Sequence, residues 1–294
     1  MPKKRPFKLL PRDEEVFAVL EHTPLTIKQI MKISQTFSER FKDKDNLGRR
    51  MRQLRSNGYV KSWSYGFPTN GRSANYFKLT PKSFRYVGDV DDMPSPTYFS
   101  EVQNHKHTVK LADFIVHLMV LAHRAGFEIR NLTRENSVSL SLEGINDSEG
   151  TMNDDAKILV RPDLGFELIV NGRPFRFFVE IDNGTERGIV SSRIDAKIRG
   201  YLAYARSLPS DQQFSVLWVA TKSEIRAANL VMRSAQYVQS QKQTLFYGAT
   251  LDAFCQSMDL ENDRIWLDVQ SRRRSMIRNV SRPEKKTGKK TVSQ

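Results

Sequence analysis

Residues 46–63, NLGRRMRQLRSNGYVKSW, hold the pattern that decides the fold of the N-terminal part of the chain. Apolar residues recur in this stretch at positions i, i+4 and i+7, the spacing of the buried stripe of an amphipathic helix. Asn57-Gly58 is typical of a left-handed helix end, and residues 59–63 then have the composition of a strand. The stretch therefore predicts a helix that begins at Asn46 and is followed directly by a strand.

Two shorter helices are expected before this stretch, and a returning strand is expected after it. Residues 13–15 are acidic and suit the start of a helix over about residues 11–20. Thr26 can cap a second helix, and a Gly- and Asn-containing loop leads back into a strand at 76–79. Three helices and a β-hairpin over residues 8–88 resemble a winged helix-turn-helix. In that family the third helix enters the major groove of DNA and the hairpin contacts the backbone.

The third predicted helix and the hairpin contain side chains suited to double-stranded DNA, the partner that this resemblance implies. Four of them are expected to reach base edges: Asn46, Arg49, Arg50 and Gln53. Four more are expected on phosphates: Arg55, Lys61, Arg72 and Lys78. The alternative is a winged helix used only for protein contacts, with its arginines forming a solvated face.

The charge of the chain is distributed unevenly. Residues 1–85 have 19 basic and 7 acidic side chains, residues 86–270 have 19 and 25, and residues 271–294 have 9 and 1. Two basic ends around an acidic middle indicate a polyanion bound by the ends, while the middle does something that needs carboxylates. A single cysteine excludes a disulfide framework. The chain has no run of about 20 apolar residues, the length that a membrane-spanning helix needs. We therefore expect a cytoplasmic protein without a membrane partner.

The 294 residues are enough for two domains. Residues 89–105 begin with DVDDMPSPT, which lacks periodicity, and are expected to be a linker. Residues 106–270 are expected to form the second domain. Residues 271–294 are expected to be a basic disordered tail that adds non-specific attraction to DNA.

The second domain is predicted to have the order α-β-β-β-α-β. Its expected helices cover residues 107–125, 189–207 and 223–239. Its expected strands cover residues 127–130, 137–142, 157–162 running on to 166–170, 176–182 and 214–220. Asn171-Gly172 predicts a tight hairpin between two of these strands. Together with the N-terminal part, the pattern predicts a two-domain α+β or α/β fold.

One group of carboxylates falls on that predicted hairpin. Asp163 precedes one strand and Glu180 ends its partner, so the hairpin is expected to bring the two carboxylates close together. Strand alternation puts Asp182 on the same face as Glu180. Two carboxylates form a site for a hard cation, so Asp163 and Glu180 are the candidate ligands of Mg²⁺ or Mn²⁺ in metal-assisted phosphodiester hydrolysis.

These residues resemble the half-motifs of the PD-(D/E)xK nuclease superfamily: Pro162-Asp163, and then Glu180-Ile181-Asp182. The chain departs from that pattern because Asp182 stands where the superfamily usually has its lysine. Some members take the lysine from the following helix, and Lys197 is available there. The resemblance implies a catalytic set of Asp163, Glu180, Asp182 and Lys197.

The two halves together resemble the replication-relaxation family of plasmid and mobile-element proteins. The residues that carry this resemblance are His107 and Asp113 at a helix start, RPD at 161–163, FFVEIDNGTER at 177–187 and KIRGYLAY at 197–204. It implies a bacterial DNA-binding protein, associated with the nucleoid or a plasmid and with other replication or mobilisation proteins; a dimer is compatible with it.

Two functions remain open for such a protein. The first, which the sequence favours narrowly, is a metal-dependent endonuclease that nicks or cleaves DNA. The second is a regulator of replication or transcription whose nuclease-like domain is a silent platform for DNA or a partner. The retained Asp163 and Glu180 favour the first function, because buried carboxylates need compensation and a metal would supply it.

Overall fold

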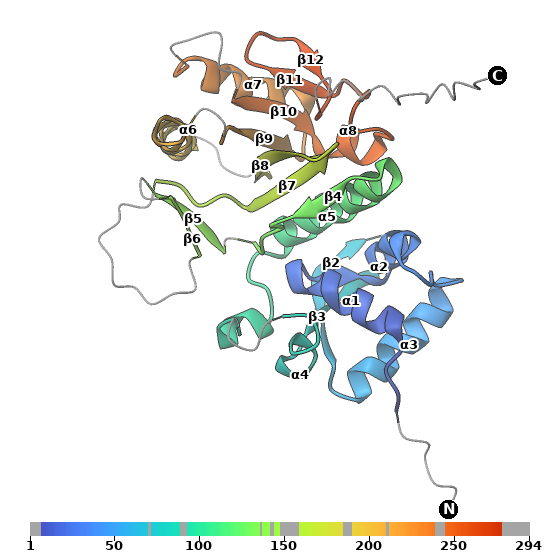
Figure 1. The fold of residues 1–294 in the computed structure, drawn as a ribbon. Helices are drawn as coiled ribbons and strands as arrows, with labels where there is room; N and C mark the ends of the chain where they lie inside the picture. Colours follow the sequence, from blue (N-terminus) through green and yellow to red (C-terminus); the bar gives the residue numbers. More distant parts are fainter. Residues whose placement is uncertain are drawn as a thin grey trace, which may run out of the picture.

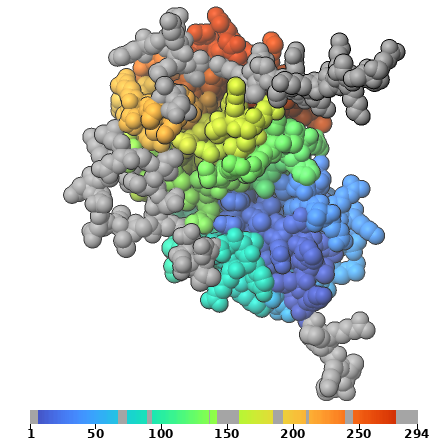
Figure 2. Space-filling view, in the orientation of Figure 1, coloured from blue at the N-terminus to red at the C-terminus, as the bar shows by residue number. Residues whose placement is uncertain are grey.

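The computed structural model describes residues 7–69, 72–88, 93–135, 137–141, 144–147, 159–184, 190–209, 212–238 and 245–277. Its fold is mixed α and β, with a small N-terminal sheet and a larger C-terminal one. Figure 1 shows the helix α5 (His105–Ala125) between these two parts, and Figure 2 shows that the parts are in direct contact.

The N-terminal part consists of helices packed on a three-stranded antiparallel sheet of order β1-β3-β2. Its elements are α1 (Pro11–His22), β1 (Leu25–Thr26), α2 (Ile27–Ile33), the 3₁₀ turn η1 (Ser34–Thr36), α3 (Lys44–Ser56), β2 (Val60–Thr69), β3 (Arg72–Leu79) and α4 (Pro81–Phe84). The three helices and the hairpin expected from the sequence are all present.

The helix α3 forms where its apolar stripe predicts it. Leu47, Met51 and Leu54 are fully buried, and Gly58 ends the helix with a φ of 74°. The helix begins at Lys44 rather than at Asn46, because the Asp43 side chain accepts a hydrogen bond from the Asn46 backbone N–H at 2.7 Å and so caps the helix two residues earlier.

The C-terminal part is a seven-stranded mixed sheet of order β12-β11-β10-β9-β8-β7-β4. The pairs β8–β9 and β9–β10 are parallel, and the other pairs are antiparallel. After the 3₁₀ turn η2 (Pro96–Phe99) and α5, the elements are β4 (Glu128–Arg130), β5 (Val138–Ser141), β6 (Gly144–Asp147), β7 (Leu164–Val170), β8 (Arg173–Asp182), α6 (Val190–Ser207), β9 (Phe214–Ala220), α7 (Glu224–Ala235), β10 (Phe246–Thr250), α8 (Leu251–Gln256), β11 (Trp266–Asp268) and β12 (Arg273–Arg274).

The large sheet has a core on each face. One core joins the sheet to α5 and α8, and the other joins it to α6 and α7. The hairpin between β7 and β8 turns at Asn171-Gly172, whose φ angles of 51° and 78° match the predicted tight turn. The expected strand over 157–162 is wrong where the structure describes it, because only an isolated bridge links Val160 to Leu140 and β7 begins at Leu164; residues 157 and 158 lie outside the described residues.

The segment expected to be a linker is packed where it is described. Phe99 is buried, and the Tyr98 hydroxyl donates to the backbone oxygen of Glu21 at 2.7 Å. Ala112, Val116 and Val120 of α5 belong to the N-terminal core, while other residues of α5 belong to the sheet core. The two parts therefore share α5, and the described part of the expected linker packs against the folded chain.

Residues 273–277, expected to belong to the tail, pack onto the sheet domain. Arg273–Arg274 form the edge strand β12, and Met276 and Ile277 are buried in the sheet core. Their apolar side chains add to the sheet core. The sequence does not indicate this burial, because the two residues closely follow a basic run. Residues 278–294 lie outside the described residues.

Candidate functional site

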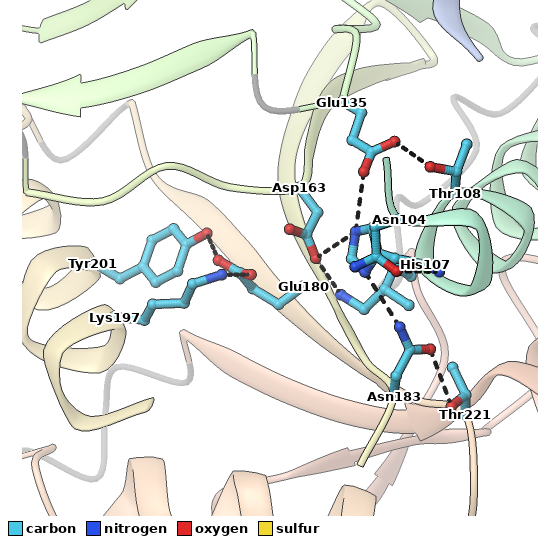
Figure 3. A network of polar contacts seen from close by, with 11 residues as sticks. Asn104, His107, Thr108, Glu135, Asp163, Glu180, Asn183, Lys197, Tyr201 and Thr221 are labelled. Atoms are coloured by element: carbon cyan, nitrogen blue, oxygen red, sulfur yellow. Dashed lines mark hydrogen bonds and ion pairs between the residues drawn. The ribbon is translucent and has the colours of Figure 1, made fainter. Parts of the chain in front are cut away.

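The register of β7 and β8 brings the two predicted carboxylates to neighbouring strands. Leu164 pairs with Val179, so Asp163 immediately precedes the paired segment and Glu180 lies on the adjacent strand. The Asp163 carboxylate accepts a hydrogen bond from the Ile181 backbone N–H at 2.7 Å. Both side chains are buried, and Figure 3 shows them in one polar network.

Glu180 is held by two side chains of α6. The Lys197 ammonium donates to one carboxylate oxygen, and the Tyr201 hydroxyl donates to the other at 2.7 Å. Lys197 therefore reaches Glu180 from the following helix, as the sequence predicts. The pKa of Glu180 is raised from 4.5 to about 7, because burial, with a smaller contribution from the Asp163 carboxylate, outweighs the opposing effects of Lys197 and Tyr201.

His107 faces Asp163 from the start of α5. Its Nε2 lies 3.5 Å from Asp163 Oδ2 and 3.6 Å from Glu135 Oε1. Glu135 also accepts a hydrogen bond from the Thr108 hydroxyl at 3.0 Å, and burial raises its pKa. On the other side of the ring, Asn183 Nδ2 lies 3.5 Å from His107 Nδ1.

Sequence reasoning missed Glu135 and Asn183 and gave His107 no site role. Glu135 lies in a connection with no motif around it, and 28 residues separate it from Asp163. Asn183 looks like a turn residue after a strand. The available signal was that His107 lies in the first turn of α5, in the motif whose pattern resembles the replication-relaxation family.

Asp182 does not belong to this network. Its carboxylate is paired with the Arg226 guanidinium of α7 through two hydrogen bonds of 2.9 Å each. The sequence places Asp182 correctly on the Glu180 face of the strand, but it cannot reveal an arginine 44 residues later that occupies both oxygens. Asp182 thus forms a structural ion pair with Arg226, and its predicted catalytic role is not supported by these contacts.

The residue types at Asp163 and Glu180 fit a hard cation such as Mg²⁺, because carboxylate oxygens are the ligands it prefers. The protein nevertheless compensates both carboxylates itself, through Lys197, Tyr201, His107 and the Ile181 N–H. Among the described residues, no group of three His, Cys, Asp or Glu side chains is placed to hold a metal ion.

The predicted DNA-contacting residues divide into exposed and enclosed side chains. Arg49, Gln53, Arg55 and Lys61 are exposed, although Arg55 donates to the Ser62 hydroxyl at 3.1 Å. The Asn46 side chain is also exposed, and it donates to the capping Asp43 at 2.6 Å. Arg72 begins β3, and its side chain lies outside the described part of the structure.

Two of the residues predicted to contact DNA have partners inside the fold. The Arg50 guanidinium is paired with the fully buried Asp13 and also donates to the Lys8 backbone oxygen. Lys78 is 7% exposed, and its ammonium donates to the Ser100 backbone oxygen at 2.8 Å. Burial lowers the pKa of Lys78 to about 8. Both cations bind partners inside the fold. The sequence pattern does not reveal these partners, which lie 37 and 22 residues away in the chain.

Comparison with known proteins identifies one family. The replication-relaxation family model matches residues 18–217, which include α3, His107, Asp163, Glu180 and Lys197. The chain belongs to the replication-relaxation family. This membership confirms the resemblance seen in the sequence and suggests a role in plasmid or mobile-element replication or relaxation. No curated protein and no solved structure matches the chain, and no helix among the described residues is long and apolar enough to cross a membrane.

Proposed function

We propose that this replication-relaxation protein binds double-stranded DNA through the outer face of α3 and the neighbouring hairpin β2–β3. The observation that carries the proposal is the exposure of α3. Its apolar stripe is buried, while Arg49, Arg52, Gln53 and Arg55 face outward on one helix. An exposed row of guanidinium and amide groups is what recognition of phosphates and base edges requires.

The arrangement of the N-terminal elements supports this proposal. The order of three helices followed by an antiparallel hairpin is that of a winged helix-turn-helix, in which the third helix enters the major groove. Residues 1–85 have 19 basic and 7 acidic side chains, so the long-range field also attracts a polyanion. The excess of basic over acidic side chains in this part is larger than solubility requires.

The test is duplex binding by the full chain, measured by fluorescence anisotropy with Arg49→Ala and Arg130→Ala. Arg130 is an exposed arginine paired with Glu128 on the edge strand β4, so its removal changes the net charge by the same amount at a distant place. Arg49→Ala should weaken binding and Arg130→Ala should not. Equal binding by both variants would contradict the proposed surface.

A second candidate function is metal-dependent cleavage of DNA in the sheet domain. The observation that favours it is the convergence of Asp163, Glu180 and Lys197 from two strands and α6. Asp163 and Glu180 would hold Mg²⁺ or Mn²⁺, and the ion would supply positive charge to the scissile phosphate and acidify the attacking water. We rank it second because protein side chains already compensate these carboxylates, so burial alone does not call for a metal.

Incubation of supercoiled plasmid with the full chain tests this candidate. Nicking or linearisation with Mg²⁺ or Mn²⁺ that is absent with EDTA and abolished in Glu180→Ala would establish it. Lys197→Ala should then lower the rate more than the affinity. If wild type and Glu180→Ala both bind the plasmid and both leave it intact, the cleavage candidate is rejected and only the DNA-binding function remains.

A further inference from the structure

A groove of about 630 Å³ opens between α3, the hairpin β2–β3 and α5. This volume lies within the range of small-molecule sites, about 300–1,000 Å³. The groove is separate from the Asp163 network, since its α5 wall is formed by Val109 and Asp113 and not by His107.

The groove has a cationic rim. Lys28, Arg52 and Arg55 line it and are exposed. Tyr65 and Phe77 line it from the hairpin. Tyr65 and Phe77 are only 1% and 8% exposed, so the exposed cations of the rim, and not ring stacking, are what suit a phosphate group.

The carboxylate of Asp113 also lines the groove. Its Oδ1 accepts a hydrogen bond from Gln29 Nε2 at 2.8 Å, and it takes part in no ion pair among the described residues. The sequence motif at the start of α5 includes Asp113, yet the Asp163 network does not use it. A half-buried carboxylate lining an open groove is an acceptor for N–H groups of a ligand.

A glycine of α3 also lines this groove. Gly48 lies within the helix, where glycine costs about 1 kcal/mol relative to alanine. A Cβ added there would meet only Arg52 Nη1, at 3.6 Å. The space beside Gly48 is therefore open, and a larger side chain at this position would occupy part of it.

We infer that the groove binds a nucleotide whose base has an amino group. Its phosphate contacts Arg52 and Arg55, and its amino edge donates to Asp113, as cytosine N4 donates to Asp or Glu side chains. The nucleotide is either free or an unstacked base of single-stranded DNA. The groove shares Arg52 and Arg55 with the proposed duplex-binding face, whereas Asp113 lines the groove and Arg49 does not. Asp113→Asn and Arg49→Ala therefore test the two proposals separately.

Anisotropy with labelled oligo-dC and oligo-dT of equal length tests the inference on the full chain. Wild type should prefer dC by roughly tenfold, because thymine offers one imide N–H between two carbonyl oxygens that a carboxylate repels. Asp113→Asn should abolish or invert this preference, since the amide keeps an oxygen for Gln29 and turns a donor toward the base. Arg52→Ala should weaken both oligonucleotides equally, and Arg130→Ala should change neither.

Gly48→Leu gives a second test that does not depend on the fold of the Asp113 variant. Leucine is the better helix former, so the variant should fold and yet lose dC binding because its side chain fills the groove. Competition by dCMP would show that a free nucleotide is sufficient. Failure of dCMP with an intact Asp113-dependent dC preference would assign the groove to single-stranded DNA. An unchanged dC to dT ratio in Asp113→Asn, with Gly48→Leu binding like wild type, would overturn the inference.

Discussion

The outer face of α3 and the polar network at β7–β8 differ in where their charged side chains lie: on α3 they are exposed to solvent, and in the network the two carboxylates of the hairpin are buried and paired. On α3, Arg49 and Arg52 are exposed to solvent. In the network, Glu180 and Asp163 are buried, and side chains of the same protein compensate both. Charge left in solvent is available to a partner at little cost, whereas charge satisfied internally must first lose its own partners. The comparison favours α3 as the binding surface and the network as an element that binds only by rearranging.

The strongest test of this comparison uses two adjacent arginines of α3. Arg50→Ala should destabilise the fold by about 3–5 kcal/mol, because it leaves the fully buried Asp13 carboxylate without its cation. Arg49→Ala should change stability by less than about 0.5 kcal/mol. Urea unfolding of the two variants measures both values, and equal stabilities would show that the Arg50 pair does not stabilise the fold.

The pH dependence of stability examines the enclosed carboxylate. Because burial raises the pKa of Glu180 from 4.5 to about 7, the folded state loses stability as pH rises through this range, by about 3 kcal/mol in total. Glu180→Gln removes this loss, so its stability relative to wild type should increase from pH 4.5 to pH 7 and then level off. Burial also lowers the pKa values of His22 and His117 to about 4, but their effect cancels in the difference. A difference independent of pH would mean that Lys197 offsets the burial completely.

The smallest expected effect belongs to Lys78, a cation that the sequence predicts on phosphates and that the structure encloses. Lys78→Met should leave duplex affinity unchanged, since the ammonium is bonded to the Ser100 backbone oxygen inside the fold. It should change stability by less than about 1 kcal/mol, because one hydrogen bond is removed while the burial of a charge is relieved. A drop in affinity as large as that of Arg49→Ala would place Lys78 on the DNA.

Local sequence patterns predicted many of the helices, strands and turns, but they did not predict which residues far apart in the chain contact each other. The stripe of α3, the Asn171-Gly172 turn and the strand 214–220 depend on neighbouring residues and are confirmed. The strands β10 to β12 and the helix α8 were missed because each is only two to six residues long.

The candidate site shows the same limit. The sequence brings Asp163, Glu180 and Lys197 together, since one hairpin and the next helix connect them. It does not reveal the ion pairs of Asp182 and Arg50, whose partners Arg226 and Asp13 lie 44 and 37 residues away. Pairings of this kind depend on how the elements pack, which residue spacing does not encode.

The salt dependence of duplex binding by the full chain tests the central claim most directly. For wild type, the logarithm of the binding constant should fall linearly with the logarithm of the salt concentration. If the exposed face of α3 binds phosphates, Arg49→Ala should flatten this slope by about 0.9 for each phosphate that Arg49 neutralises, while Arg130→Ala should leave it unchanged. Duplex binding that is insensitive to salt, or a slope that Arg49→Ala leaves unchanged, would contradict the account.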